Sequence, residues 1–236
     1  MKNRKFRIGI GILLIPIIFF SCDPGIVGNG DVETKKKDVG NFNRVDIHGN
    51  FDVFLEQTGK TGLRIEADEN LFDIIDIDEV GNTLRIRSEV NIIRAKRKNI
   101  YIQFDDLKEL DLSGALEVRG EGKIKVRSLD IAGSGASDVN LDVEVNWLDI
   151  DVSGAGDFDF TGSAKEANLI ISGVGGFDLI DLRTEKMNLD ISGAAHARVF
   201  VTEELDVEIS GAGNVRYKGN PEISRSVSGI GSLKKY

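Results

Sequence analysis

The sequence predicts an all-β protein built as a parallel β-helix, a solenoid in which short strands stack coil upon coil. The first observation is a recurrent Ser-Gly phrase whose anchor glycines are 18 to 21 residues apart. The second is an alternation of aliphatic and polar residues on both sides of these glycines. Such a repeat favours units that bury their apolar faces against neighbouring units. The anchor glycines are Gly114, Gly133, Gly154, Gly173, Gly193, Gly211 and Gly229.

Each repeat is expected to form a strand, a corner and a second strand. Aliphatic residues stand four and two positions before each anchor glycine, as Leu110 and Leu112 do, and the residue between them is usually acidic. A period of two is the pattern of a strand with one buried face. Alternation resumes four and six positions after the glycine, where Phe158 and Phe160 are predicted to be core. Small corner residues allow successive coils to stack closely.

Two other folds were weighed against the β-helix. A leucine-rich horseshoe would need a helical segment and an asparagine signature after each strand, and the repeats contain neither. A β-sandwich would show antiparallel hairpins without a fixed register. The repeat therefore favours parallel coils about 4.8 Å apart, with aliphatic side chains inside and Asp and Ser outside.

Residues 1–21 are predicted to be a lipoprotein signal peptide. A basic start precedes an apolar run over residues 8–20, which is shorter than the roughly 20 residues of a membrane-spanning helix. The run ends at Ser21, directly before Cys22, and a small residue before the only cysteine resembles a bacterial lipobox. We therefore expect cleavage before Cys22 and lipid attachment to its thiol, which would anchor the protein to a membrane. The alternative is an ordinary signal peptide with an incidental cysteine.

The remainder divides into a tether and one β-helix domain. Residues 22–39, with glycines, asparagines and three consecutive lysines, are expected to form a flexible tether. Residues 40–236 are expected to form a single β-helix domain. Within it, 40–108 alternate without the Ser-Gly period and are interpreted as irregular first coils that cap the array, because end units of a solenoid differ from the middle. Residues 109–236 are expected to form the regular rungs.

The net charge of the chain disfavours one class of partner. Loss of residues 1–21 would remove four basic residues, which leaves 26 Lys and Arg against 39 Asp and Glu, a net charge of −13. This balance argues against nucleic acid as a partner, because its phosphates would be repelled. The one basic cluster, over residues 94–98, is interpreted as a solvated loop, with an acidic partner as the alternative.

Several phrases together resemble a known family. They are Phe-Asp-Val-Phe-Leu from Phe51, Ile-Glu-Ala-Asp-Glu-Asn from Ile65, the Ser-Gly-x-Gly series, and Val-Arg-Tyr-Lys-Gly-Asn-Pro from Val215. The chain resembles the family described as putative auto-transporter adhesin, head GIN domain, over about residues 40–232. The resemblance implies a right-handed β-helix akin to pectin-lyase-like folds, a role in cell adhesion and no established catalytic residues. The Gly-Ile-Asn tripeptide of the family name does not occur here, so no contact is assigned to it.

The candidate for chemistry is a column of exposed residues five positions after each anchor glycine. In the expected register, Asp138, Asp159 and Asp178 stack on adjacent rungs and Arg198 follows. Carboxylates about 5 Å apart repel one another unless a cation intervenes, so a surface Ca²⁺ site is one hypothesis. Catalysis by the same carboxylates, as in a polysaccharide lyase or glycosidase, is a second. The interpretation we favour is that these side chains keep the sheet soluble. A second acidic column, which includes Asp130, is interrupted by Ile170.

The favoured function is that of a non-enzymatic lipoprotein of the cell envelope, adhesin-like, which binds or scaffolds through a repetitive β-helix surface. The alternative is a calcium-dependent polysaccharide lyase or glycosidase. No cofactor and no confident metal ligand are expected, and only one tryptophan, Trp147, could serve as an aromatic platform. The expected partners are a membrane through the lipid anchor, a protein or glycan, or other copies of the chain. The expected location is the outer membrane, and the sequence leaves periplasmic and surface display open.

Overall fold

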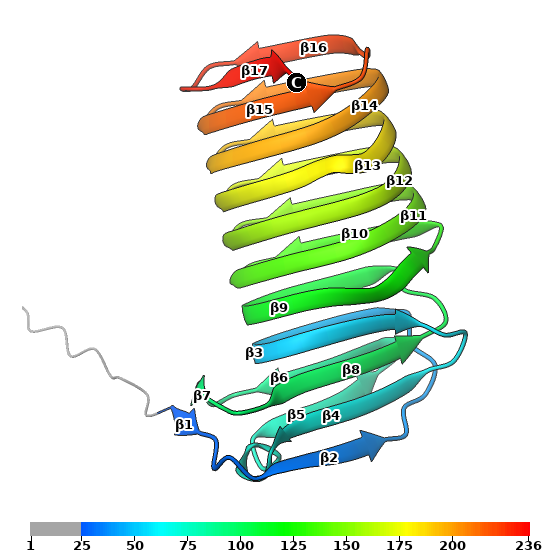
Figure 1. Cartoon of the computed structure of the whole chain (residues 1–236), viewed down its shortest axis with the longest axis vertical. Coiled ribbons are helices and arrows are strands. Elements are labelled where there is room, and N and C mark those ends of the chain that lie inside the picture. The colour runs from blue at the N-terminus through cyan, green and yellow to red at the C-terminus, as the bar shows by residue number, and fades with distance from the viewer. Residues whose placement is uncertain (1–24) are drawn as a thin grey trace, which may run out of the picture.

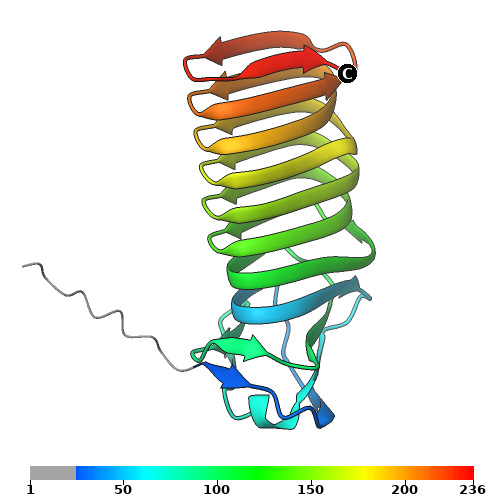
Figure 2. The same cartoon turned by 60° about the vertical axis from the view of Figure 1, so that its left-hand side comes forward.

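Buried and exposed side chains alternate along the strands in the regular part of the molecule. The computed structural model describes residues 25–236, in which the chain climbs as a right-handed parallel β-solenoid above an irregular β-sheet cap (Figures 1 and 2). In β11 every second side chain is buried over most of the strand, and the residues between them are exposed. The right-handed coil agrees with the sense that parallel crossovers adopt. The predicted fold class, including its irregular N-terminal region, is confirmed.

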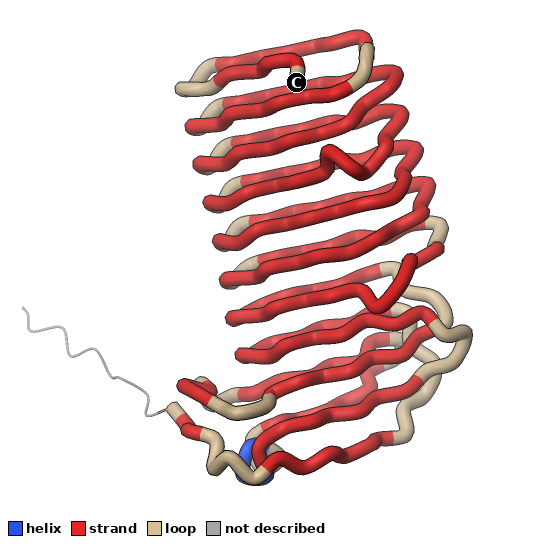
Figure 3. The backbone as a smooth tube through the Cα atoms, viewed as in Figure 1, coloured by secondary structure: helices blue, strands red, loops and turns tan. Residues whose placement is uncertain are grey.

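The coils are made by nine strands, several of which turn through almost a full circuit (Figure 3). Residues before each Ser-Gly corner form what we call the back face, and residues after it form the front face, which is nearer the viewer in Figure 1. The strands are β9 (Glu109–Lys125), β10 (Ser128–Gly133), β11 (Ala136–Val152), β12 (Ala155–Ile171), β13 (Val174–Ile191), β14 (Ala194–Ile209), β15 (Ala212–Lys218), β16 (Glu222–Val227) and β17 (Ser232–Lys235).

The corners stack glycine upon glycine. A Cβ on Gly173 would stand 1.8 Å from the carbonyl oxygen of Gly154, and a Cβ on Gly154 would stand 1.9 Å from that of Gly135. No side chain fits at such a distance, so the tight corner requires glycine in every coil. The same contact recurs along the whole array. Its members are Gly49, Gly114, Gly135, Gly154, Gly173, Gly193, Gly211 and Gly229.

One anchor glycine predicted from the sequence is wrong. Gly135, not Gly133, lies over Gly114, and Gly133 pairs with Leu112 and Val152 in an inward column. The phrase Ala-Gly-Ser-Gly-Ala at this corner offers two glycines, and the spacing admitted either one. In the structure Ser134 and Gly135 stack on the corners above and below, so Gly135 is the anchor glycine. The register predicted for this coil is therefore shifted by two residues.

The cap contains the remaining strands and one short helix. Its elements are β1 (Ile26–Val27), β2 (Val32–Lys37), β3 (Arg44–Gln57), β4 (Gly62–Asp68), the 3-10 helix η1 (Glu69–Leu71), β5 (Ile75–Val80), β6 (Thr83–Ser88), β7 (Ile92–Arg94) and β8 (Lys98–Phe104). Strand β3 lies between β8 and β9. The chain therefore forms the coil of β3 first, then the strands of the base below it, and continues with β9 above β3. Strands β2, β4 and β8 pair antiparallel, as do β5 and β6.

The segment expected to be a flexible tether contains two strands. Strand β2 pairs with β4 from Val32 opposite Asp68 to Lys37 opposite Leu63, and β1 pairs in parallel with β7. The interpretation of 22–39 as a tether is therefore corrected for these strands. The physical reason is that β4 would otherwise present an unpaired edge, which β2 covers. The predicted signal peptide, 1–21, and Cys22 lie outside the described residues.

The core runs without interruption from the cap into the coils. The inward columns are aliphatic and aromatic, and Phe158 and Phe177 stack at a centroid distance of 5.1 Å with both rings buried. Phe160 is buried too, so Phe158 and Phe160 are core as predicted. At the C-terminal end, Arg225 in β16 pairs with Val207 and continues its inward column. A charge at this position disfavours pairing of the last strand with another chain. Between residues 25 and 236, no helix has the length and apolar character needed to span a membrane.

Candidate functional site

The predicted acidic column on the front face has a different membership in the structure. Asp159 lies between Asn140 below and Asp178 above, and Arg198 follows Asp178. Asp138 is instead one column closer to the corner, opposite Glu117. This displacement follows from the corrected corner at Gly135, so the predicted stack of three aspartates is wrong in its first member.

Of the two remaining carboxylates, Asp178 is paired with a cation in the column. Arg198 makes a direct ion pair and hydrogen bond with Asp178. Burial raises the pKa of Asp159, and repulsion from Asp178 raises it further. Arg198 therefore neutralises Asp178, whereas Asp159 stands between Asp178 and the uncharged Asn140.

Asp138 and Asp157 serve the backbone of the next coil. A carboxylate oxygen of Asp138 accepts a hydrogen bond from the N–H of Asp157 at 3.1 Å, and Asp157 accepts one from the N–H of Gly176 at 2.9 Å. These contacts link coils on the outside of the solenoid. Over the described residues, no group of three or more His, Cys, Asp or Glu side chains is arranged to hold a metal ion. The structure thus does not bring Asp138, Asp159 and Asp178 together as one ligand set.

The back face is the more acidic of the two surfaces. Asp130 stands between Glu109 and Asp149, not in the column of Asp111 that the sequence register predicted, because Ala132 takes that place. Burial raises the pKa of Asp130, and the charges of Asp149 and Glu109 add to the rise. Burial and the charge of Glu109 likewise raise the pKa of Asp111. The lower coils of this face therefore concentrate negative charge, which Arg44 offsets in part through its ion pair with Glu109 at 3.1 Å.

A shallow groove of 320 Å³ runs up the back face beside this acidic region. It lies between two exposed columns, and its floor is formed by Leu148, Ala167 and Met187. The first column consists of Trp147, Glu166, Lys186 and Glu204. The second column consists of Asp149, Asn168, Asn188 and Asp206. One residue pair per coil thus lines the groove over four successive coils.

Polar contacts hold the walls of the groove in place. The amide of Asn168 donates to Asp149 at 3.2 Å, and the amide of Asn188 donates to the side-chain oxygen of Asn168 at 2.9 Å. Lys186 lies 3.3 Å from Glu204, whose hydrogen bond and charge raise the pKa of the lysine. Sequence reasoning missed this groove, although the two asparagines at equivalent positions of adjacent repeats were a readable signal.

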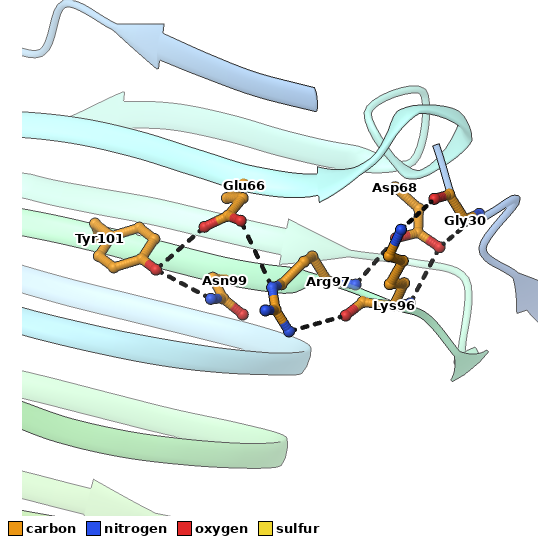
Figure 4. Close-up of polar contacts among 7 residues, drawn as sticks. All are labelled: Gly30, Glu66, Asp68, Lys96, Arg97, Asn99 and Tyr101. Carbon is orange, nitrogen blue, oxygen red and sulfur yellow. Dashed lines mark hydrogen bonds and ion pairs between the residues drawn. The ribbon is translucent and has the colours of Figure 1, made fainter. Parts of the chain in front are cut away.

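The cap is held by a buried carboxylate that has no counterpart in the coils (Figure 4). Asp68, at the end of β4, accepts backbone N–H groups from Gly30 at 3.0 Å, Lys96 at 3.1 Å and Arg97 at 3.0 Å. Burial opposes ionisation of Asp68, but these three hydrogen bonds outweigh it and hold the pKa below its ordinary value. Asp68 thereby joins three segments that are distant in sequence.

The basic cluster predicted as a solvated loop is largely engaged within the cap. Arg97 lies 3.5 Å from Glu66, and Lys98 lies 3.2 Å from Asp52. The ammonium of Lys96 donates to the carbonyl oxygen of Gly30 at 3.3 Å (Figure 4). These cations stabilise the base of the solenoid, which leaves them little charge to offer an acidic partner.

Comparison with known proteins places most of the described fold in a recognised family. A family model described as putative auto-transporter adhesin, head GIN domain, matches residues 41–221. None of the curated proteins matches the chain.

Solved structures match over most of the chain. A putative adhesin from Bacteroides fragilis is 27% identical with a TM-score of 0.85, and the match covers 90% of this chain and 100% of that one. A putative lipid binding protein from Parabacteroides distasonis is 25% identical with a TM-score of 0.72, over 90% and 100% of the two chains. A putative adhesin from Parabacteroides merdae shares the fold at 24% identity, with a TM-score of 0.68 over 90% and 99%.

Proposed function

Since the chain belongs to the family of putative auto-transporter adhesins with a head GIN domain, we propose that it is a non-enzymatic adhesin-like lipoprotein of the cell envelope. The observation that carries this proposal is the repetition of exposed side chains at equal intervals along two extended faces. Such surfaces suit extended or multivalent contacts, in which several weak interactions add along one partner. The similar chain from Bacteroides fragilis is described as a putative adhesin, which supports the same role.

The proposal includes anchoring through Cys22. Lipid on this residue would place the cap next to the bilayer, because β1 begins only a few residues later. The solenoid axis would then carry the coils and the C-terminal end away from the cap (Figure 2). One similar structure is described as a putative lipid binding protein, and a bound lipid is therefore the second candidate class of ligand. The acidic coils disfavour anionic lipid head groups on their exposed faces.

Catalysis is the less supported alternative. In a β-helical lyase the arginine would have to act as the base, and here Arg198 is paired with Asp178. Asp159 and Asp178 are neighbours, yet Asp178 is neutralised and the third predicted carboxylate is in another column. We propose that these side chains provide solubility and contacts between coils.

The test uses the full chain in cells that present a Gram-negative envelope. Metabolic labelling with a fatty-acid analogue should mark the wild-type protein and not Cys22→Ala, and cells that carry the wild type should adhere to a second cell or surface more than Cys22→Ala cells. Equal adhesion by cells without the protein would refute the adhesin role. Release of unsaturated uronates or new reducing ends from polysaccharides by the purified chain would restore the enzyme alternative.

A further inference from the structure

We propose that the groove between the Trp147 and Asn168 columns of the back face binds an uncharged linear glycan. The proposal rests on the adhesin role and deepens it, because it assigns the class of partner and the residues that contact it. The groove follows the solenoid axis, and its pairs of wall residues repeat once per coil. A repeating site suits a repeating polymer, and the coil spacing of about 4.8 Å is close to the length of one sugar unit.

Trp147 provides a platform at the lower end of the groove. The residue is 39% exposed although indole is among the largest apolar groups, and the guanidinium of Arg127 lies over its ring at 5.1 Å. Arg127 fixes the orientation of the indole through a cation–π contact. An exposed, oriented aromatic ring offers a flat apolar surface to the C–H face of a sugar while its N–H remains available to a hydroxyl.

The second wall offers hydrogen-bonding groups suited to hydroxyls. An amide carries two N–H donors. Asn168 uses one of them on the carboxylate of Asp149, and Asn188 uses one on the side-chain oxygen of Asn168. The second donors, together with the carboxylates of Asp149 and Asp206, can pair with neighbouring hydroxyls of a sugar. A concave surface with an apolar ring and a few oriented polar groups has the character of a small-ligand site.

Charge selects the kind of glycan. Four carboxylates and one lysine line the groove, and that lysine is paired with Glu204. Uronic acids, sulfated sugars and phosphates would be repelled, whereas an uncharged chain would not. Nucleic acid is disfavoured by the same argument.

Another aromatic surface of the described chain lacks an open ring face. In the cap, Tyr101 stacks on Phe54 at 4.7 Å, and Arg64 covers its other side at 3.4 Å from the ring centre. Both faces of Tyr101 are therefore occupied within the protein. Trp147, by contrast, is partly exposed, and Arg127 is the ring partner that the described residues provide for it. The groove of Trp147 is therefore the better place for a sugar ring to stack.

The decisive measurement uses the intrinsic fluorescence of the full chain, whose only tryptophan is Trp147. The protein, in a zwitterionic detergent without sugar, is titrated with cellohexaose, mannohexaose, xylohexaose and chitohexaose, and with polygalacturonate as the charged comparison. We expect a saturable change of emission with at least one uncharged hexasaccharide and none with polygalacturonate. Absence of a change with all four hexasaccharides, or binding of polygalacturonate as well, would overturn the inference.

Variants locate the site by calorimetry with the hexasaccharide that binds. Trp147→Ala and Asn188→Ala should each weaken binding about tenfold, which corresponds to about 1.4 kcal/mol, because each removes a stacking or hydrogen-bonded contact with the sugar. Ile170→Ala is the matched control, because Ile170 is exposed on the same face but belongs to the column of Asp151 and Asp190. Equal affinity in all three variants would contradict the groove. Circular dichroism confirms that each variant is folded.

The two proposals fail separately. Cells that adhere in the assay above while the purified chain ignores every hexasaccharide would retain the adhesin role and exclude the glycan groove. Hexasaccharide binding lost in Trp147→Ala, with no adhesion by cells that carry the wild type, would support the groove and refute the role in adhesion.

Discussion

The cap and the regular coils bury similar side chains but hold them in different ways. In the coils, each strand pairs in parallel with the next, and the corners repeat the same glycine contact from Gly114 to Gly229. In the cap, strands pair antiparallel and in parallel, and Asp68 joins three separate segments by hydrogen bonds. The coils are thus held by one contact that recurs at every corner, whereas the cap depends on contacts, such as those of Asp68, that occur once.

Electrostatics differ in the same way. The carboxylate of Asp68 is held ionised by backbone N–H groups, and its pKa is lowered. The carboxylates of Asp111 and Asp130 stand in columns with other acids, and their pKa values are raised. The first stabilises the fold when charged, and the others oppose it when charged. Acid is therefore expected to destabilise the cap, whereas in the coils it removes the repulsion between stacked carboxylates.

The largest expected effect is at a corner of the coils. Gly173→Ala would place a Cβ 1.8 Å from the carbonyl oxygen of Gly154, between coils that cannot separate without losing their ladder. We expect a loss of about 4 kcal/mol or more in the free energy of unfolding, measured by urea denaturation. Gly133→Ala is the matched control, because the nearest atoms to its Cβ would be side-chain atoms, of Phe158 at 3.3 Å and of Val152 at 3.6 Å. Its change should stay within about 1 kcal/mol. Similar losses in both variants would show that the glycine corners are not special.

A smaller but still large effect is expected in the cap. Asp68→Ala would leave the N–H groups of Gly30, Lys96 and Arg97 without their buried acceptor, which should cost about 3 kcal/mol in unfolding experiments at neutral pH. Asp73→Ala, an exposed change in the same cap, should cost little. A cap that tolerated Asp68→Ala as well as Asp73→Ala would contradict the dependence on single residues.

The pH dependence of the Asp68 effect has a definite sign. The folded pKa lies below the unfolded value of about 3.9, so the stabilisation is complete above that value and is lost as the pH falls through the folded pKa. The difference in melting temperature between wild type and Asp68→Ala should therefore shrink in acid. A difference that stays constant down to strong acid would show that Asp68 acts by packing alone.

The smallest effect is expected on the back face and has the opposite sign. Asp130→Asn removes a charge that burial and Asp149 and Glu109 disfavour, so the variant should be more stable at neutral pH. Because solvent screens this exposed group, the gain should be no more than about 0.5 kcal/mol. It should vanish below about pH 3.9, where the wild-type carboxyl is protonated in both states. Thermal melts of Asp130→Asn at neutral and acid pH measure the gain, and destabilisation at neutral pH would count against repulsion.

Much of the fold was readable from the sequence. The alternation over residues 44–47, 51–57, 63–67, 83–87 and 100–104 corresponds to strands β3, β4, β6 and β8. The cap order was not readable, because no local signal says that β3 lies between β8 and β9. Strand β2 was missed because its three lysines read as a solvated segment, and only the open edge of β4 makes that segment a strand.

The candidate sites were less predictable than the fold. A two-residue error at one corner moved Asp138 into a column where the structure has Asn140, since every exposed column depends on the register of each coil. The groove of Trp147, Asn168 and Asn188 gathers residues from several coils, and each residue alone reads as an ordinary surface position.

By itself the sequence determined the strand–corner–strand unit of each coil, because a period of two and glycine at each tight corner are local requirements of backbone geometry. It also determined the excess of negative charge on the coils. Only the tertiary structure decided which glycine stacks at the second corner, which strand closes the cap, and which exposed side chains face one another. Those choices depend on contacts between residues distant in sequence, and such contacts are selected by the packing of whole coils.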